Sequence, residues 1–248
     1  MNTALRISGH AASRAAIASV ATASVLLVLK GYAAWVTGSV AMLGSLSDTG
    51  LDLLASLVTL YGVHLAAQPA DLNHRFGHGK AEALAALFQV TLITLSAGAI
   101  CVHAIERLGS AAQPVHGEYG IVVSLIAIGL TLALVAYQRR AMRVTNSLAV
   151  RTDNLHYESD LFLNLSVIAA LVLDQWLGWH GVDALFGLGI AFWLAWGAWR
   201  AASHAINQLM DKEWPEEKRQ QFLAVASQHP ELKGIHDLRT RTSGVHDF

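Results

Sequence analysis

Two pairs of metal-ligating residue types occur in stretches that are otherwise apolar. Asp48 and Asp52 are four residues apart, and so are His156 and Asp160. Residues at this spacing lie on one face of a helix, where two carboxylates repel each other unless a cation lies between them. Three carboxylates and one imidazole suit a tetrahedral zinc site and also accept ferrous iron, cadmium or cobalt. The sequence therefore predicts a four-ligand site for a divalent transition metal.

The helices that carry these pairs place them at matching depths. Asp48 and Asp52 are expected about 12 to 18 Å from one end of their helix, at 1.5 Å per residue. His156 and Asp160 are expected about 8 to 14 Å from the end of their helix at the other side of the membrane, so the two pairs approach the same level from opposite sides. A simpler alternative is that the acids bond to nearby Ser and Thr hydroxyls and that the histidine only packs between helices. Two pairs at one depth favour the metal site.

A second cluster follows in a polar loop. Asp71, His74 and His78 lie within eight residues of a chain that contains glycine, and their spacing can wrap one cation. Loops with several histidines are also often only solvated. Both interpretations stay open from the residues alone.

The composition indicates a membrane protein. Of 248 residues, 54% are hydrophobic and only 14% are charged, and the net charge of −1 offers no electrostatic basis for binding nucleic acid. Cys101 is the single cysteine, which excludes a disulfide framework. Segments long and apolar enough to cross a bilayer predict an all-α fold of six transmembrane helices. They are 14–37, 40–66, 82–107, 118–138, 151–176 and 183–206.

The basic residues predict the orientation of these spans. Most of them fall on one side of a six-helix path that runs up and down. They are Arg6, Arg14, Arg75, Lys80, Arg139, Arg140, Arg143, Arg151, Lys212, Lys218 and Arg219. Positive charge gathers on the cytoplasmic side of membranes, so both termini are expected inside a bacterial inner membrane.

The last forty residues change character. Pro215 and two acids begin an amphipathic helix that is expected to reach about Gln228, and residues 235–242 alternate as a strand does. One helix and one strand cannot bury a core. We therefore expect a transport domain at 1–210 and, at 211–248, the start of a small cytoplasmic α/β domain that is incomplete here.

Taken together, these motifs resemble the bacterial zinc and ferrous-iron efflux branch of the cation diffusion facilitator family. The likeness rests on both ligand pairs, on the loop from Pro69 to Lys80 and on the tail from Gly234 to Arg241. It implies a homodimer in the lipid bilayer, a transport site formed by the four intramembrane residues and a second metal site in the loop. It also implies a charge pair, Lys80 with Asp211, that helps to hold protomers together. The resemblance further implies a metallochaperone-like cytoplasmic domain in which His236 matches a metal ligand.

The chemistry of the ligands predicts coupling to protons. Metal binding needs neutral imidazole and ionised carboxylates, so protons and metal compete for the same side chains. The sequence thus predicts an antiporter of Zn²⁺, with Fe²⁺ or Cd²⁺ as other cargoes, rather than an enzyme. A membrane metal sensor with the same ligands would bind without moving metal. An intramembrane metallohydrolase is less favoured, because four protein ligands leave no position for water.

Overall fold

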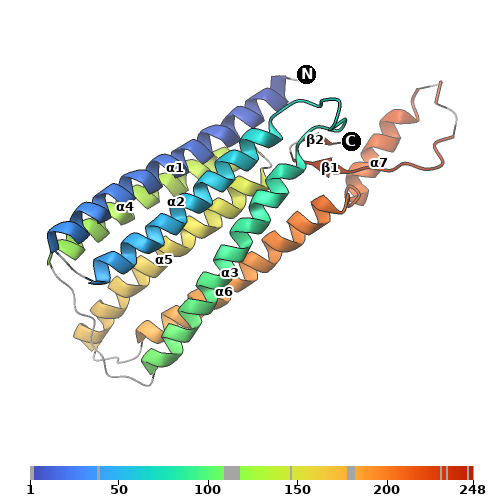
Figure 1. Cartoon of the computed structure of the whole chain (residues 1–248). Helices are drawn as coiled ribbons and strands as arrows, with labels where there is room; N and C mark the ends of the chain where they lie inside the picture. The colour runs from blue at the N-terminus through green and yellow to red at the C-terminus, as the bar shows by residue number, and fades with distance from the viewer. Residues whose placement is uncertain are drawn as a thin grey trace.

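The computed structural model describes residues 3–37, 40–108, 118–145, 147–177, 182–229, 231–232, 234–244 and 246–247. Its main body is a set of long helices that run alternately up and down (Figure 1). They are α1 (Thr3–Thr37), α2 (Val40–Ala66), α3 (Lys80–Leu108), α4 (Glu118–Met142), α5 (Leu148–Leu177) and α6 (Val182–Leu209). The N-terminus, the loop between α2 and α3 and the C-terminal segment lie at one end of the bundle (Figure 1).

Five of the six predicted spans are confirmed by length and apolar composition within the described residues. Apolar stretches that can cross a membrane lie in α1, α2, α3, α4 and α6. The sixth, α5, is 30 residues long, and no candidate span was found in its described residues. The first half of α5 contains the charged residues Arg151, Asp153, Glu158 and Asp160. Helix α5 contacts α1, α2, α3, α4 and α6, so its polar side chains can meet protein instead of lipid.

Small side chains let the helices approach closely. Ala15, Ala83, Ala149 and Ala205 are completely buried, on four different helices. At Gly62 of α2, a Cβ atom would lie only 2.5 Å from the Cβ of Ala85 on α3. Close backbone approach at small residues is the usual basis of helix packing in membranes, where apolar side chains gain little by leaving lipid.

Helices α3 and α6 form a closely packed pair. A cluster of buried apolar residues joins them along much of their length, and a smaller cluster of alanines continues it at the end nearest the C-terminal segment. The larger cluster contains Val90, Ile93, Ala97, Leu194 and Ala198. A further apolar cluster joins α1, α2, α4 and α5, with Ala85 of α3 at its edge. Helix α5 lies between the two groups and contacts both.

The C-terminal segment contains the expected helix, but the expected strand is mostly absent. Helix α7 runs over Glu216–Ala226 after Pro215, as predicted. The prediction of a strand over 235–242 was wrong except at its last residue. Only β1 (Thr242–Ser243) is strand, and it pairs antiparallel with β2 (His246–Asp247). Residues 235–241 have no adjacent strand in the described part of the chain to accept their backbone hydrogen bonds.

Candidate metal centre

Three of the four predicted intramembrane ligands converge between α2 and α5. Asp52 projects from α2, and His156 and Asp160 project from successive turns of α5. The Nε2 atom of His156 lies 2.8 Å from Oδ1 of Asp52 and 3.9 Å from Oδ2 of Asp160. One ligand atom from each residue lies within 4.8 Å of the other two. An imidazole nitrogen and two carboxylate oxygens at this spacing can contact one cation.

Asp48, the fourth predicted ligand, lies outside this group. It is one helical turn before Asp52 on α2, and its side chain is exposed. Asp48 interacts electrostatically with Asp52 and with Lys30 of α1. Lys30 itself donates a hydrogen bond of 2.7 Å to the hydroxyl of Thr49. The sequence could not name a partner for this intramembrane lysine, and the structure places it beside the acidic residues of α2.

A buried carboxylate that sequence reasoning missed holds α5 in place. Asp153 is completely buried, one turn before His156. It accepts hydrogen bonds of 2.6 Å from Ser19 Oγ on α1 and 2.6 Å from Gln89 Nε2 on α3. A third bond, of 2.7 Å, comes from Gln138 Nε2 on α4. Because one side chain of α5 is bonded to three other helices, these contacts fix the rotation of α5 and hence the direction of His156.

Tyr157, the residue after His156, joins α5 to α2. Tyr157 is nearly completely buried, and its hydroxyl lies 2.8 Å from the Oγ of Ser56 on α2. The next residue, Glu158, accepts a 2.9 Å hydrogen bond from Arg139 of α4. Glu158 therefore joins helices instead of facing the metal ligands. The missed signal was Asp153 itself, because an acid among apolar residues requires a partner or a function.

The three predicted loop ligands also lie together. Within the loop between α2 and α3, Asp71 Oδ1 is 3.4 Å from His74 Nδ1, and Asp71 Oδ2 is 3.5 Å from His78 Nε2. The two imidazole rings are 4.4 Å apart between centroids. As in the membrane site, one ligand atom from each residue lies within 4.8 Å of the others. Two imidazoles and one carboxylate therefore face a common point.

Local backbone geometry shapes this loop. Backbone N–H groups of His74 and Asn73 donate to Asp71, and these bonds lower the pKa of the Asp71 carboxyl below its ordinary value. The carboxyl is thus held ionised, as a metal ligand must be. Gly77 has a φ of +76°, a backbone conformation that residues with a side chain rarely adopt. A Cβ at Gly79 would overlap the carbonyl oxygen of Ser243, so β1 packs directly against the loop.

The predicted charge pair forms within one chain. Lys80 Nζ, at the start of α3, lies 2.9 Å from Oδ2 of Asp211, just after α6, and it also donates to the carbonyl of Leu209. The bond from Lys80, helped by the nearby Arg241 guanidinium, lowers the pKa of the Asp211 carboxyl. Asp211 has a left-handed φ of 55°. The pair therefore joins the ends of the α3 and α6 helices.

The remaining predicted ligand, His236, is exposed in the C-terminal segment. Within the described residues it belongs to no group of three potential metal ligands.

Comparison with known proteins identifies the family. The model of a family described as the cation efflux transmembrane domain matches residues 16–210. This chain belongs to the cation efflux family. A cation-efflux pump FieF of Klebsiella pneumoniae is 46% identical over 240 residues, which cover 97% of this chain and 80% of the relative. The FieF pumps of Shigella boydii serotype 18 and Escherichia coli O1:K1 are each 45% identical over the same shares of both chains.

Membership confirms the resemblance drawn from the sequence motifs. The family and the apolar helices together make the chain a multi-pass membrane transporter of cations rather than an enzyme. The described ligand groups lie in the regions that the sequence singled out, namely α2 with α5 and the loop before α3.

Proposed function

We propose that this chain exports a divalent transition metal, with zinc as the leading cargo, in exchange for protons. The observation that carries the proposal is the convergence of Asp52, His156 and Asp160 inside a cation efflux domain. One imidazole and two carboxylates are borderline to hard ligands, which suit zinc and also accept ferrous iron or cadmium. The cargo binds between α2 and α5, where a relative movement of the two helices changes the site.

Asp48 completes the coordination in this proposal. It lies one turn from Asp52 on the same helix, so a change of its side-chain rotamer brings it toward the shared cation. Without metal, its charge and that of Asp160 are offset in part by Lys30, which interacts electrostatically with both. A cation bound between the carboxylates neutralises their negative charge in place of Lys30. The metal-loaded site then has four protein ligands.

The hydrogen bond between His156 and Asp52 gives a physical basis for proton exchange. The Nε2 atom that would coordinate a metal instead lies 2.8 Å from the Asp52 carboxylate, a distance at which a hydrogen bond requires a proton on one of the two groups. Metal can bind only when that proton leaves. Loading from the cytoplasm therefore releases protons, and protonation from the other side expels the metal.

The membrane orientation and the second metal site form part of the same proposal. Helix α5 is the sixth span, and its polar half is accommodated by contacts with the five other helices of the bundle. The basic end of the bundle faces the cytoplasm of a bacterial inner membrane, with residues 211–248 beginning a cytoplasmic domain. The loop site of Asp71, His74 and His78 then holds zinc at the cytoplasmic surface. Two copies form a homodimer, and Lys80 with Asp211 steadies the α3–α6 pair near the contact between them.

Metal-driven proton flux tests the proposal. The purified chain is placed in sealed proteoliposomes with a pH dye, and zinc, cadmium, ferrous iron and manganese are added in turn. We expect proton movement that requires metal, is lost in Asp52→Ala and is retained in Asp237→Asn. Asp237 is an exposed carboxylate that pairs with Arg239 in the C-terminal segment, so it controls for the loss of one charge.

Two results would contradict antiport. Tight zinc binding without flux in sealed vesicles would favour a metal sensor. Equal flux in the wild type and in Asp52→Ala would remove the predicted site from transport.

A further inference from the structure

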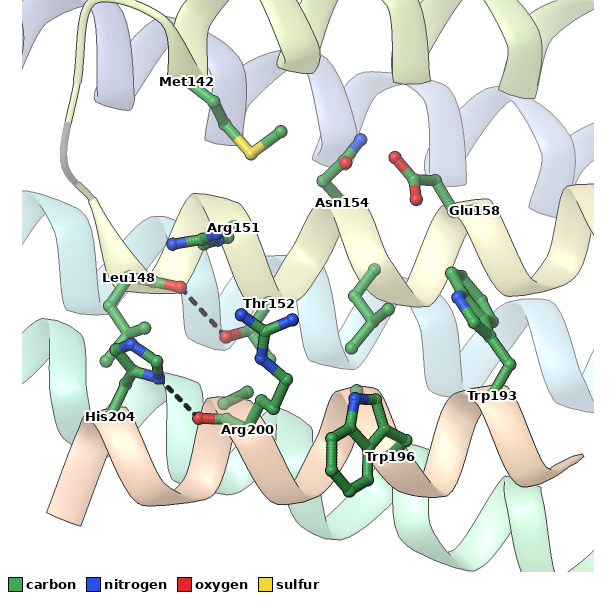
Figure 2. A pocket seen from close by; sticks show the side chains of 13 residues that line it. Met142, Leu148, Arg151, Thr152, Asn154, Glu158, Trp193, Trp196, Arg200 and His204 are labelled. Carbon is green, nitrogen blue, oxygen red and sulfur yellow. Dashed lines mark hydrogen bonds between the residues drawn. The ribbon is translucent and has the colours of Figure 1, made fainter.

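A cavity between α5 and α6 lies outside the metal sites and contains unusual charge. It has a volume of about 320 Å³ and opens near the end of the bundle where α5 begins. Figure 2 shows Arg200 rising from α6 toward α5, where Arg151 and Thr152 lie. At Gly197 a Cβ would come within 2.8 Å of Leu155, so the two helices touch closely along the cavity floor.

The two arginines of this cavity, Arg151 and Arg200, have no acidic partner among the described residues. Glu158 also lines the cavity, but Arg139 already pairs with it at 2.9 Å. His204 adds a third basic side chain, and its Nδ1 donates a 2.7 Å hydrogen bond to the carbonyl of Arg200. This bond orients the imidazole ring, and Nε2 of His204 has no partner among the described residues.

The wall of the cavity is aromatic. Trp193 packs edge-on against Phe162 with 5.2 Å between ring centroids. Trp196 lies on the outer surface of α6 with 58% of its area exposed. Tryptophan concentrates where the acyl chains of a bilayer meet the head groups. The cavity therefore combines an apolar wall for a hydrocarbon chain with two guanidinium groups above it.

The positions of the two arginines along their helices allow both guanidinium groups to lie at the level of the lipid head groups. Arg151 follows the start of α5 by three residues, or about 5 Å, and Arg200 precedes the end of α6 by nine residues, or about 14 Å. A long arginine side chain extends toward the membrane surface and keeps its stem along apolar neighbours. The two guanidinium groups can thus approach one phosphate from two helices, the geometry that arginine provides best.

We propose that this cavity binds one anionic glycerophospholipid, with its phosphate between Arg151 and Arg200 and an acyl chain along Trp193 and Trp196. The net positive charge selects an anionic lipid over a zwitterionic one, because Glu158 is already paired and none of the other described lining residues is an acid that could accept a head-group ammonium. The bound lipid joins α5, which carries His156 and Asp160, to α6. Lipid binding is independent of the metal sites and can be measured without metal.

Native mass spectrometry of the full chain in detergent tests this site. The probes are phosphatidylglycerol, phosphatidylcholine and inorganic phosphate. We expect phosphatidylglycerol to be retained, and its affinity to fall about five- to tenfold in Arg151→Gln and in Arg200→Gln. Arg143→Gln is the matched control, because Arg143 is exposed at the same end of the bundle and does not line the cavity.

Each alternative occupant gives a different result that would overturn the proposal. Equal retention of phosphatidylcholine, unchanged in both arginine variants, would show an apolar crevice with no phosphate selectivity. Binding of inorganic phosphate with the affinity of the lipid would show a soluble anion site. A change in the fraction of dimer in Arg200→Gln, with lipid retention unaltered, would show that a second copy of the chain covers the cavity. Melting temperatures in detergent verify that both variants remain folded.

Discussion

The two candidate metal sites have similar ligands but opposite construction. In the membrane site, Asp52 and His156 come from helices far apart in sequence and are partly or fully buried. In the loop site, Asp71, His74 and His78 come from eight consecutive residues, and the first two side chains are about half exposed. The first site therefore depends on how α2 and α5 pack, whereas the second depends on a short stretch of backbone. Only the first changes when helices move, as transport requires.

The largest expected effect comes from removing a membrane ligand. Asp160→Asn should lower zinc-driven transport by at least about 100-fold, because the amide cannot supply an ionised ligand. Initial rates of zinc uptake into inverted vesicles measure the effect. His78→Ala, which removes a ligand of the loop site, serves as the matched variant and should retain most of the rate. A similar loss in both variants would show that the two sites do not differ in function.

The buried network around Asp153 should come next. Asp153→Ala leaves donors from Ser19, Gln89 and Gln138 without their acceptor, and each unpaired buried group costs about 1 to 3 kcal/mol. We expect the apparent melting temperature in detergent to fall by about 5 to 10 °C. Zinc affinity of the membrane site should fall about tenfold, because the rotation of α5 is no longer fixed.

Asp153→Asn separates positioning from folding. The asparagine retains an acceptor oxygen, so it should recover most of the melting temperature and part of the zinc affinity. If Asp153→Ala leaves both melting and affinity unchanged, Asp153 does not position His156.

Loss of a loop ligand should have a local effect. In His78→Ala, one zinc ion fewer should bind per chain, while the affinity of the membrane site stays the same. Equilibrium dialysis with zinc measures both quantities. His229→Ala is a suitable control, since His229 lies in the C-terminal segment outside both ligand groups. Wild-type stoichiometry in His78→Ala would remove the loop from metal binding.

The smallest effect is expected at the charge pair that joins α3 and α6. Asp211→Asn should lower stability by at most about 1 kcal/mol, because both partners are more than a third exposed. The folded pKa of Asp211 is depressed, so its stabilising contribution is present above the ordinary carboxyl pKa of 3.8 and disappears as pH falls through the lower folded value. Melting curves of wild type and Asp211→Asn should therefore differ at neutral pH and converge in strong acid. A constant difference at every pH would contradict the ion pair.

Local spacing made much of this structure predictable from the sequence. The i, i+4 pairs on α2 and α5 require only that the chain be helical there, and the Asp71 to His78 motif requires only a polar loop that contains glycine. Asp153 was not predicted because its partners Ser19, Gln89 and Gln138 come from three other helices. Their meeting depends on packing that no local pattern encodes. Likewise, alternation over 235–242 suggested a strand, but a strand forms only where a neighbour supplies backbone partners.

Simultaneous measurement of zinc and proton movement in the same sealed vesicles tests the central claim most directly. The wild type and His156→Ala are compared at acid and neutral pH. We predict opposite fluxes of zinc and protons in the wild type, with a pH dependence that is blunted in His156→Ala together with weaker zinc binding. Zinc movement without proton movement, or identical transport by both proteins at both pH values, would contradict exchange at the site formed by Asp52, His156 and Asp160.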